Sequence, residues 1–562
     1  MSTIIAGVIS RRLPALVLLL AGGALTWAMV RHGVFWQPAF VVATGSLLLL
    51  RLQGQWRPAK ELAEELVAEQ APVLRQRNRV RMVLREAPRT LIHQCSLRLE
   101  IIIFVLIAGA IFYQVLVPPV VGLADNGDFG RLMAQTGLAY TPYDSGVDSG
   151  TINLHFLVGK PHFLAAGYAT SELVFVKAAL LFNGLVSSDG TFDLRVLGAF
   201  HAVAFLAGLA LILVATRTLP RPSRWASAVL MLLVFTDVGY VAYFNTLYRE
   251  SAALVFLTLS VGCALLYIRA RKSNLGLLLA YFVAAALFVA AKPQYVPLGL
   301  LLAIFGVLLS RRWSGGRSYR SWASVGMAAA LCSVGAWSYT AQPGNLSQAV
   351  VYSHTFSDLL VHSSTPKADL ADLGVDPALA KWTGTDVFDK HIPIKDPAFK
   401  QSFFSHVTPT TLVGFYTTHP VRTAGLLNRA AQQGTSLRAG YLDGSARTSG
   451  IVREALGSAL AVWSSLREAL PLGSLAGLAF ILGAAASAGA LVRVRCDRLQ
   501  DKILVELFLF LIAMAAVQFL AVSLVSATLD VVRHLSVFNL LIDMATIMAV
   551  SYGANWWSDI VS

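Results

Sequence analysis

The sequence predicts an all-α membrane protein that crosses the bilayer about twelve times and carries two long loops on its outer face. Hydrophobic residues make up 56% of the 562 residues and charged residues only 14%, so most of the chain must be surrounded by lipid. Apolar stretches of about 15 to 23 residues recur along the chain, and each can cross a hydrocarbon core of about 30 Å as a helix. A backbone in lipid must satisfy its own hydrogen bonds, which helices do. These observations exclude a soluble protein.

Twelve stretches, separated by charged residues, meet this description. They are residues 13–30, 34–50, 101–121, 196–215, 225–244, 252–268, 275–291, 296–310, 322–339, 472–492, 503–525 and 535–556. The first follows Arg11 and Arg12, as the apolar part of a signal peptide does. We expect it to remain as an anchor, because it has 18 residues and a second stretch follows directly.

The basic residues predict the orientation. Ten Arg or Lys between positions 51 and 98, and pairs such as Arg311 and Arg312, fall in loops of one parity, whereas loops of the other parity carry single cations. Cytoplasmic loops are rich in Lys and Arg, so we expect both termini in the cytoplasm and the protein in a bacterial inner membrane. The same alternation explains the net charge of +14 without a nucleic-acid partner. None of the four cysteines lies in an outer loop, so no disulfide framework is implied.

The chain divides into four regions. Residues 1–98 hold the first two stretches and a charged segment that we expect along the cytoplasmic membrane surface, near anionic lipid. Residues 99–339 form a transmembrane core whose first outer loop, 122–194, includes an expected interfacial helix over 171–185. Residues 340–471 are too long for a connector and predict an extracytoplasmic cap, with 415–431 as its clearest amphipathic stretch. Residues 472–562 supply the last transmembrane helices.

Two acids follow the third apolar stretch, Asp125 and Asp128. A carboxylate just outside a span can reach a lipid-borne substrate at headgroup level, as a general base must. Asn126-Gly127 between them predicts a turn that sets the two acids in a compact hairpin. The alternative is that both are solvated loop acids.

Cations lie in the short outer turns. Arg249 and Glu250 are wedged between two spans, where charges are costly unless paired or used. Arg249 can bind a phosphate through two nitrogens; alternatively it only pairs with Glu250. Lys292 lies in the next such turn, although a terminal lysine often reaches the interface without a role. Arg533 and His534 lie in the last.

Three polar residues fall inside predicted spans, namely Asp237, Asn539 and Asp543. Such groups should face the interior of the bundle. The cations at the outer turns can together neutralise a phosphate or pyrophosphate and stabilise its charge as a leaving group. Beside a carboxylate base, this set suits group transfer from a phosphate-linked lipid.

Short runs of these residues resemble the GT-C superfamily of integral-membrane glycosyltransferases, and within it the bacterial hexosyltransferases of cell-surface glycan assembly. The resemblance covers residues 99–556. The runs are Asn126-Gly127-Asp128-Phe129, Phe244-Asn245 with Tyr248-Arg249-Glu250-Ser251, Lys292-Pro293-Gln294, and Arg533-His534 with Phe538-Asn539 and Asp543. No counterpart of residues 1–98 is recognised.

The resemblance implies a GT-C-like helical bundle that binds a polyprenyl-phosphate sugar, with an acid of the first outer loop as catalytic base. It makes Asp128 the base and Arg249, Lys292 and Arg533 ligands of the donor phosphate. The other residues expected at the donor site are Asn245, Tyr248, Glu250, Gln294 and His534. The acids are spaced Asp-Asn-Gly-Asp, not as the tandem or once-interrupted pair common in the superfamily, which leaves the roles of Asp125 and Asp128 interchangeable.

The expected activity is transfer of a sugar, with inversion, from a polyprenyl-phosphate donor to a glycan, lipid or protein acceptor on the outer face. No cofactor is required, and no dedicated metal-ligand set is evident, although a divalent cation is compatible with the site. One alternative is a ligase or polymerase of lipid-linked glycans that uses undecaprenyl pyrophosphate. Another is a transporter or flippase of an anionic lipid-linked substrate. Transporters tend to bind at the midplane between repeated halves, whereas these charges lie in outer turns.

Overall fold

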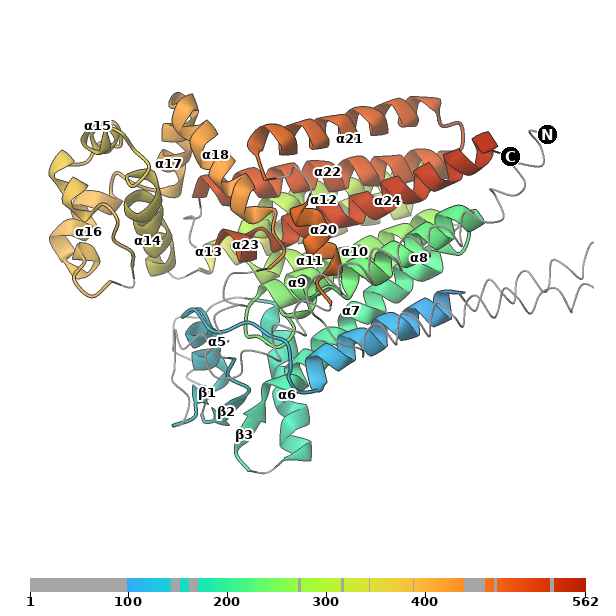
Figure 1. Cartoon of the computed structure of the whole chain (residues 1–562), viewed down its shortest axis with the longest axis horizontal. Helices are drawn as coiled ribbons and strands as arrows, with labels where there is room; N and C mark the ends of the chain where they lie inside the picture. Colours follow the sequence, from blue (N-terminus) through green and yellow to red (C-terminus); the bar gives the residue numbers. More distant parts are fainter. Residues whose placement is uncertain are drawn as a thin grey trace, which may run out of the picture.

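The computed structural model describes residues 99–142, 152–160, 170–187, 189–270, 274–314, 318–342, 344–387, 389–438, 460–469, 473–525 and 530–561. The first two expected spans, the charged segment before residue 99 and Cys95 lie outside these residues. Figure 1 shows long helices running side by side, with shorter helices stacked at one end of the bundle.

Seven described helices have the length and hydropathy of membrane spans, which confirms the prediction of an all-α polytopic membrane protein. They comprise the helix Leu99–Leu116, α7 (Leu194–Thr216), α10 (Glu250–Arg269), α12 (Val296–Ser314), α21 (Leu475–Arg495), α22 (Leu499–Val525) and α24 (Ser536–Val561). A shorter apolar helix, α11 (Leu275–Ala291), has the same bounds as the predicted span.

Two further predicted spans differ from expectation. The stretch predicted over 225–244 is divided into α8 (Arg221–Phe235) and α9 (Val238–Val241). The side chain of Asp237 accepts a hydrogen bond from Gly239 N and so begins α9. The stretch 322–339 is longer, as α13 (Tyr319–Thr340).

Aromatic residues mark both ends of α13. Tyr319 and Trp322 near one end and Trp337 and Tyr339 near the other are all exposed. Tyr319 and Tyr339 are about 30 Å apart along the helix, which is the distance between the two interfacial layers where Trp and Tyr gather. This spacing fits a helix that crosses the membrane.

Small residues let α7 and α10 pack closely. A Cβ on Gly208 of α7 would lie 2.9 Å from Thr258 of α10, and one on Gly262 of α10 would lie 3.0 Å from the carbonyl oxygen of Gly208. Glycines at such contacts are how membrane helices approach each other. Since α11 packs on the other side of α10, α10 is enclosed in the middle of the bundle.

The first long loop contains a small sheet that the sequence did not predict. The chain runs through α5 (Phe129–Thr136), β1 (Leu138–Tyr140), β2 (His155–Val158), α6 (Glu172–Val186) and β3 (Thr191–Asp193). The strands are antiparallel in the order β1-β2-β3, with Leu138 opposite Val158 and Phe156 opposite Phe192. The helix α6 occupies the stretch expected as an interfacial helix, and its Leu181 and Leu185 are exposed, by 73% and 86%.

The second long segment forms short helices at one end of the bundle (Figure 1). They are α14 (Gly344–Ser353), η2 (His354–Leu359), α15 (Pro366–Asp372), η3 (Pro377–Trp382), η4 (Pro393–Lys395), α16 (Pro397–Phe404), α17 (Pro409–Thr418) and α18 (Pro420–Gly434). A further short helix, α20 (Val462–Glu468), lies against α8 and α24 of the bundle. Phe356, Phe399 and Phe403 lie in a hydrophobic core of its own. The amphipathic stretch expected over 415–431 is divided between two helices, because α17 ends before His419 and α18 begins at Pro420.

Candidate functional site

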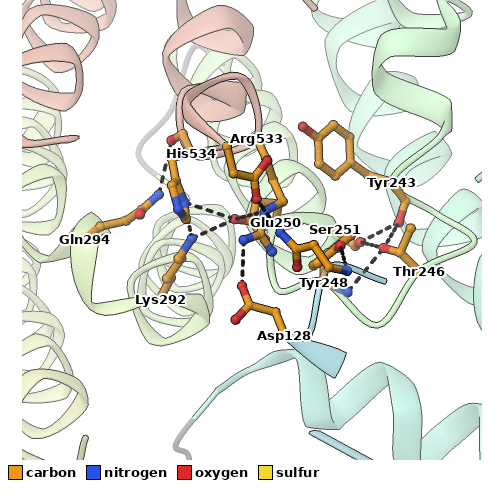
Figure 2. A network of polar contacts seen from close by, with 12 residues as sticks. Asp128, Tyr243, Thr246, Tyr248, Glu250, Ser251, Lys292, Gln294, Arg533 and His534 are labelled. Atoms are coloured by element: carbon orange, nitrogen blue, oxygen red, sulfur yellow. Dashed lines mark hydrogen bonds and ion pairs between the residues drawn. The ribbon is translucent and has the colours of Figure 1, made fainter. Parts of the chain in front are cut away.

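A cluster of charged side chains lies where four segments meet at one end of the bundle. These are the loop before α5, the start of α10, the turn between α11 and α12, and α23 (Val531–His534). Figure 2 shows Asp128, Glu250, Lys292, Arg533 and His534 directed toward one another. Residues more than 400 positions apart in the chain thus come into contact.

Asp125 organises the loop that presents Asp128. Its Oδ1 accepts hydrogen bonds from Gly127 N at 2.8 Å and Phe129 N at 3.1 Å, and its Oδ2 accepts one from the hydroxyl of Tyr140. Gly127 has φ of 101°, a conformation that favours glycine. The predicted Asn-Gly turn is therefore present, but the expected hairpin is wrong, because α5 begins at Phe129.

Asp128 is the acid that points into the cluster. Its Oδ2 accepts a hydrogen bond from Arg533 Nη2 at 2.6 Å, and its Oδ1 lies 3.7 Å from Arg131. Burial favours the neutral acid, but Arg533, Arg249 and Lys292 outweigh burial and hold the pKa of Asp128 below its usual range. Asp128 is therefore ionised at neutral pH, and 29% of its side chain remains exposed. The two acids are not interchangeable in this structure.

Arg533 lies at the centre of the cluster. Besides Asp128, its Nε lies 2.5 Å from Asp530 Oδ2, and its guanidinium carbon lies 4.2 Å from the centre of the Tyr248 ring. Arginine suits such a position, because its planar group can stack on a ring while it donates hydrogen bonds in the plane.

Glu250 joins the turn between α11 and α12 to α23. The residue is 1% exposed, and its Oε1 lies 2.7 Å from Lys292 Nζ, 3.8 Å from His534 Nδ1 and 3.9 Å from Arg533 Nε. Lys292 also lies 2.7 Å from His534 Nδ1. A lysine ammonium can only donate, so Nδ1 accepts and the imidazole is neutral. Burial and Lys292 lower the pKa of His534, which favours this form.

Burial also affects the two remaining cations. It lowers the pKa of Lys292 to about 8, although Glu250 opposes the shift. It lowers the pKa of Arg249 to about 10, opposed by Glu250 and Asp128. Arg249 is therefore within electrostatic reach of both acids, and Lys292 pairs directly with Glu250 at 2.7 Å.

The structure brings most of the predicted site residues together. Around Glu250 and Arg533 it gathers Asp128, Tyr248, Arg249, Lys292, Gln294 and His534. The Gln294 side chain contributes by donating to the backbone oxygen of His534 at 3.2 Å. Asn245 lies apart, because its Nδ2 donates to the backbone oxygens of Val115 and Val121 and so holds the loop after the helix Leu99–Leu116.

One acid of the site was missed by the sequence analysis. Asp530 accepts a hydrogen bond from Asn126 Nδ2 at 2.8 Å and contacts Arg533, so it links α23 to the Asp125–Asp128 loop. Its φ of 68° is a left-handed conformation that aspartate tolerates better than most residues. The spacing of Asp530 and Arg533, three residues apart in the short turn before α24, was a signal that could have identified it.

A second polar network lies behind the cluster. Asp543 accepts hydrogen bonds from Tyr240, Trp463 and Arg467, and Arg467 also donates to Asn539 at 2.8 Å. Asp237 accepts one from Ser464 N. Asp237, Asn539 and Asp543 are at most 1% exposed, which confirms that they face the interior. The network joins α20 to the bundle. Arg467 was not predicted from the sequence as the partner of Asp543.

Among the residues that the structure describes, no group of three or more His, Cys, Asp or Glu side chains is arranged to hold a metal ion.

The fold and the site together define the class of protein. It is an α-helical membrane bundle with acids and cations gathered at one end. The particular family follows from a comparison with known families. Residues 86–562 match the family described as the YfdI N-terminal transmembrane domain, and the chain belongs to this family. No curated protein matches the chain.

Proposed function

We propose that this protein is a GT-C type glycosyltransferase of the bacterial inner membrane. It transfers a sugar from a polyprenyl-phosphate donor to a glycan, lipid or protein acceptor on the extracytoplasmic face. The observation that carries the proposal is the 2.6 Å contact between Asp128 and Arg533, within a cluster that also holds Lys292 and Arg249. A base and phosphate-binding cations at one point are what this transfer needs.

The reaction assigns a separate task to each group. Asp128 takes the proton of the acceptor hydroxyl, whose oxygen forms a bond to the anomeric carbon. The bond from that carbon to the phosphate oxygen breaks, and its electron pair leaves with the polyprenyl phosphate. Arg533, Lys292 and Arg249 stabilise this phosphate as charge develops on it. Attack opposite the leaving group inverts the anomeric configuration.

The contact between Asp128 and Arg533 implies an order of binding. A carboxylate held by an arginine is a weak base, because the cation favours its ionised form. A donor phosphate that takes over Arg533 weakens this hold, and the pKa of Asp128 rises toward the range of a working base. Donor binding then precedes activation of the acceptor.

A lipid-linked glycan ligase or polymerase is the second candidate. It would use undecaprenyl pyrophosphate, and the cations near Asp128, which are Arg249, Lys292 and Arg533, suit two phosphates as well as one. The donor's phosphate count distinguishes the two activities.

The test is release of the lipid carrier by purified protein in lipid nanodiscs. We expect sugar from a polyprenyl-phosphate sugar to appear on the acceptor, with one free polyprenyl phosphate per sugar transferred. Release of polyprenyl pyrophosphate from a pyrophosphate-linked glycan would instead support the ligase. Movement of intact donor across a bilayer without release would support a flippase and contradict the proposal. Asp497→Asn, at the exposed turn between α21 and α22, is the matched control and should transfer normally.

A further inference from the structure

Tyr248 contacts Arg533 and the chain segments on both sides of Asp128. It precedes α10 and is 1% exposed. Its hydroxyl donates to the backbone oxygen of Ala124 at 2.7 Å and accepts from the backbone N of Asn126 at 3.0 Å. It therefore holds the backbone on both sides of Asp125, at Ala124 and at Asn126, and Asn126 lies two residues before Asp128.

The ring of Tyr248 makes the other contacts. The Arg533 guanidinium lies over its face, at 4.2 Å from the centre, a distance typical of a cation–π contact. Phe129, the first residue of α5, packs edge to face against the same ring with centres 4.6 Å apart. Tyr248 thus contacts the chain on both sides of Asp128, at Asn126 and at Phe129. Arg533 stacks on the same ring.

These contacts argue against a direct chemical role for Tyr248. Its single hydroxyl proton is already donated to Ala124, and burial raises the pKa of Tyr248, so the proton stays in place at neutral pH. The Tyr248 hydroxyl is hydrogen-bonded to the backbone of both Ala124 and Asn126. It therefore fits neither the expected role as a ligand of the sugar donor nor the role of an acid or base.

We propose that Tyr248 is a positioning residue that sets the distance and direction between Asp128 and Arg533. The hydroxyl fixes the base, and the ring fixes the phosphate-binding arginine. The inference rests on the proposed transfer reaction. Displacing a reacting group by about 1 Å can lower the reaction rate about a hundredfold. The rate of transfer therefore depends on the position of the Asp128 carboxylate and not on its presence alone.

Two substitutions separate the two parts of the side chain. Tyr248→Phe keeps the ring and removes the hydroxyl, and we expect kcat to fall by about ten- to a hundredfold with little change in the donor KM. Tyr248→Leu also removes the ring, and we expect the donor KM to rise by about tenfold in addition. The matched control is Tyr281→Phe, because Tyr281 is equally buried and donates to the backbone oxygen of Leu302 at 2.7 Å.

A second measurement needs no turnover. If Tyr248 positions Asp128, the double variant Tyr248→Phe/Asp128→Asn loses less in its unfolding midpoint than the sum of the single losses. The pair Tyr281→Phe/Asp128→Asn should lose the full sum.

The outcomes distinguish this inference from the proposed function. A kcat of Tyr248→Phe equal to that of Tyr281→Phe, or additive losses in the Tyr248 cycle, would overturn the positioning role. The proposed function would be overturned if the wild-type protein transferred no sugar from any polyprenyl donor. If the losses in the Tyr248 cycle were still non-additive, the positioning role would remain supported.

Discussion

Replacing Glu250 by glutamine removes a buried negative charge around which three side chains are arranged. The carboxylate lies 2.7 Å from Lys292 Nζ, 3.8 Å from His534 Nδ1 and 3.9 Å from Arg533 Nε. Glutamine has nearly the same shape, and its amide oxygen can still accept a hydrogen bond from Lys292. The change therefore tests the charge with little change in packing.

The expected cost follows from burial. Removing one partner of a buried ion pair leaves the other charge without compensation and costs about 3–5 kcal/mol. Glu250 and the Lys292 side chain are 1% and 8% exposed, so water screens the pair little. Because glutamine keeps one hydrogen bond, we expect the lower end, about 3 kcal/mol. The variant should also bind the donor more weakly, since Glu250 supports the charged form of Lys292.

The assay is equilibrium unfolding in mixed detergent micelles, followed by tryptophan fluorescence. Glu468→Gln is the matched control, because it removes an ion pair with Arg438 of the same 2.7 Å length but 43% exposed on the acid side. An exposed pair contributes at most about 1 kcal/mol. Glu250→Gln/Lys292→Met, which removes both charges, should regain part of the loss. If Glu250→Gln costs no more than Glu468→Gln, the charge arrangement proposed here is wrong.

Three further predictions concern donor binding, the second network and orientation. Lys292 loses its proton as the pH rises through about 8, so the affinity for the sugar donor should fall across that pH. Lys292→Arg should shift this fall to a higher pH. An affinity that stays constant from pH 7 to pH 9 would count against Lys292 as a ligand. Arg467→Met leaves the Asp543 carboxylate buried without its cation. The free energy of unfolding should therefore fall by about 3 kcal/mol, while the affinity for the sugar donor stays unchanged. A loss of donor affinity in a stable variant would contradict this prediction. Cys496 is a free cysteine between α21 and α22, and in a Cys95→Ser background an impermeant maleimide should label it in inverted vesicles only; labelling in right-side-out vesicles would reverse the orientation.

Hydropathy was enough to predict most of the bundle. The predicted span over 275–291 has the bounds of α11, and the other described spans differ from prediction mainly at their ends. The clearest failure among the helices is the stretch 225–244, where one helix ends at Phe235 and Asp237 begins a short second one. A single acid in an apolar stretch is ambiguous in sequence, because only its hydrogen bond with Gly239 N shows that it caps a helix.

The small sheet and the proline break were harder to predict for different reasons. Strands of three or four residues are too short to show an alternating pattern. The division between α17 and α18 was readable, since Pro420 disfavours a helical conformation at His419. The periodicity of 415–431 outweighed this signal in the prediction.

The cations of the site were found because charges in short turns between spans are costly. Sequence spacing left the roles of Asp125 and Asp128 open, and only the structure separates them, through the backbone hydrogen bonds of the first and the Arg533 contact of the second. Arg467 could not be paired with Asp543 from the sequence, since 76 positions separate them and nothing local links them.

The most direct test of the account compares donor binding and transfer in Asp128→Asn, in a single turnover with the polyprenyl-phosphate sugar in excess over acceptor. Asparagine keeps the size of the side chain and can still accept from Arg533, so donor affinity should remain close to that of the wild type. Transfer should fall by about a hundredfold or more, because general-base catalysis contributes about 10²–10⁴ in rate. Transfer at the wild-type rate would contradict the assignment of Asp128 as the base.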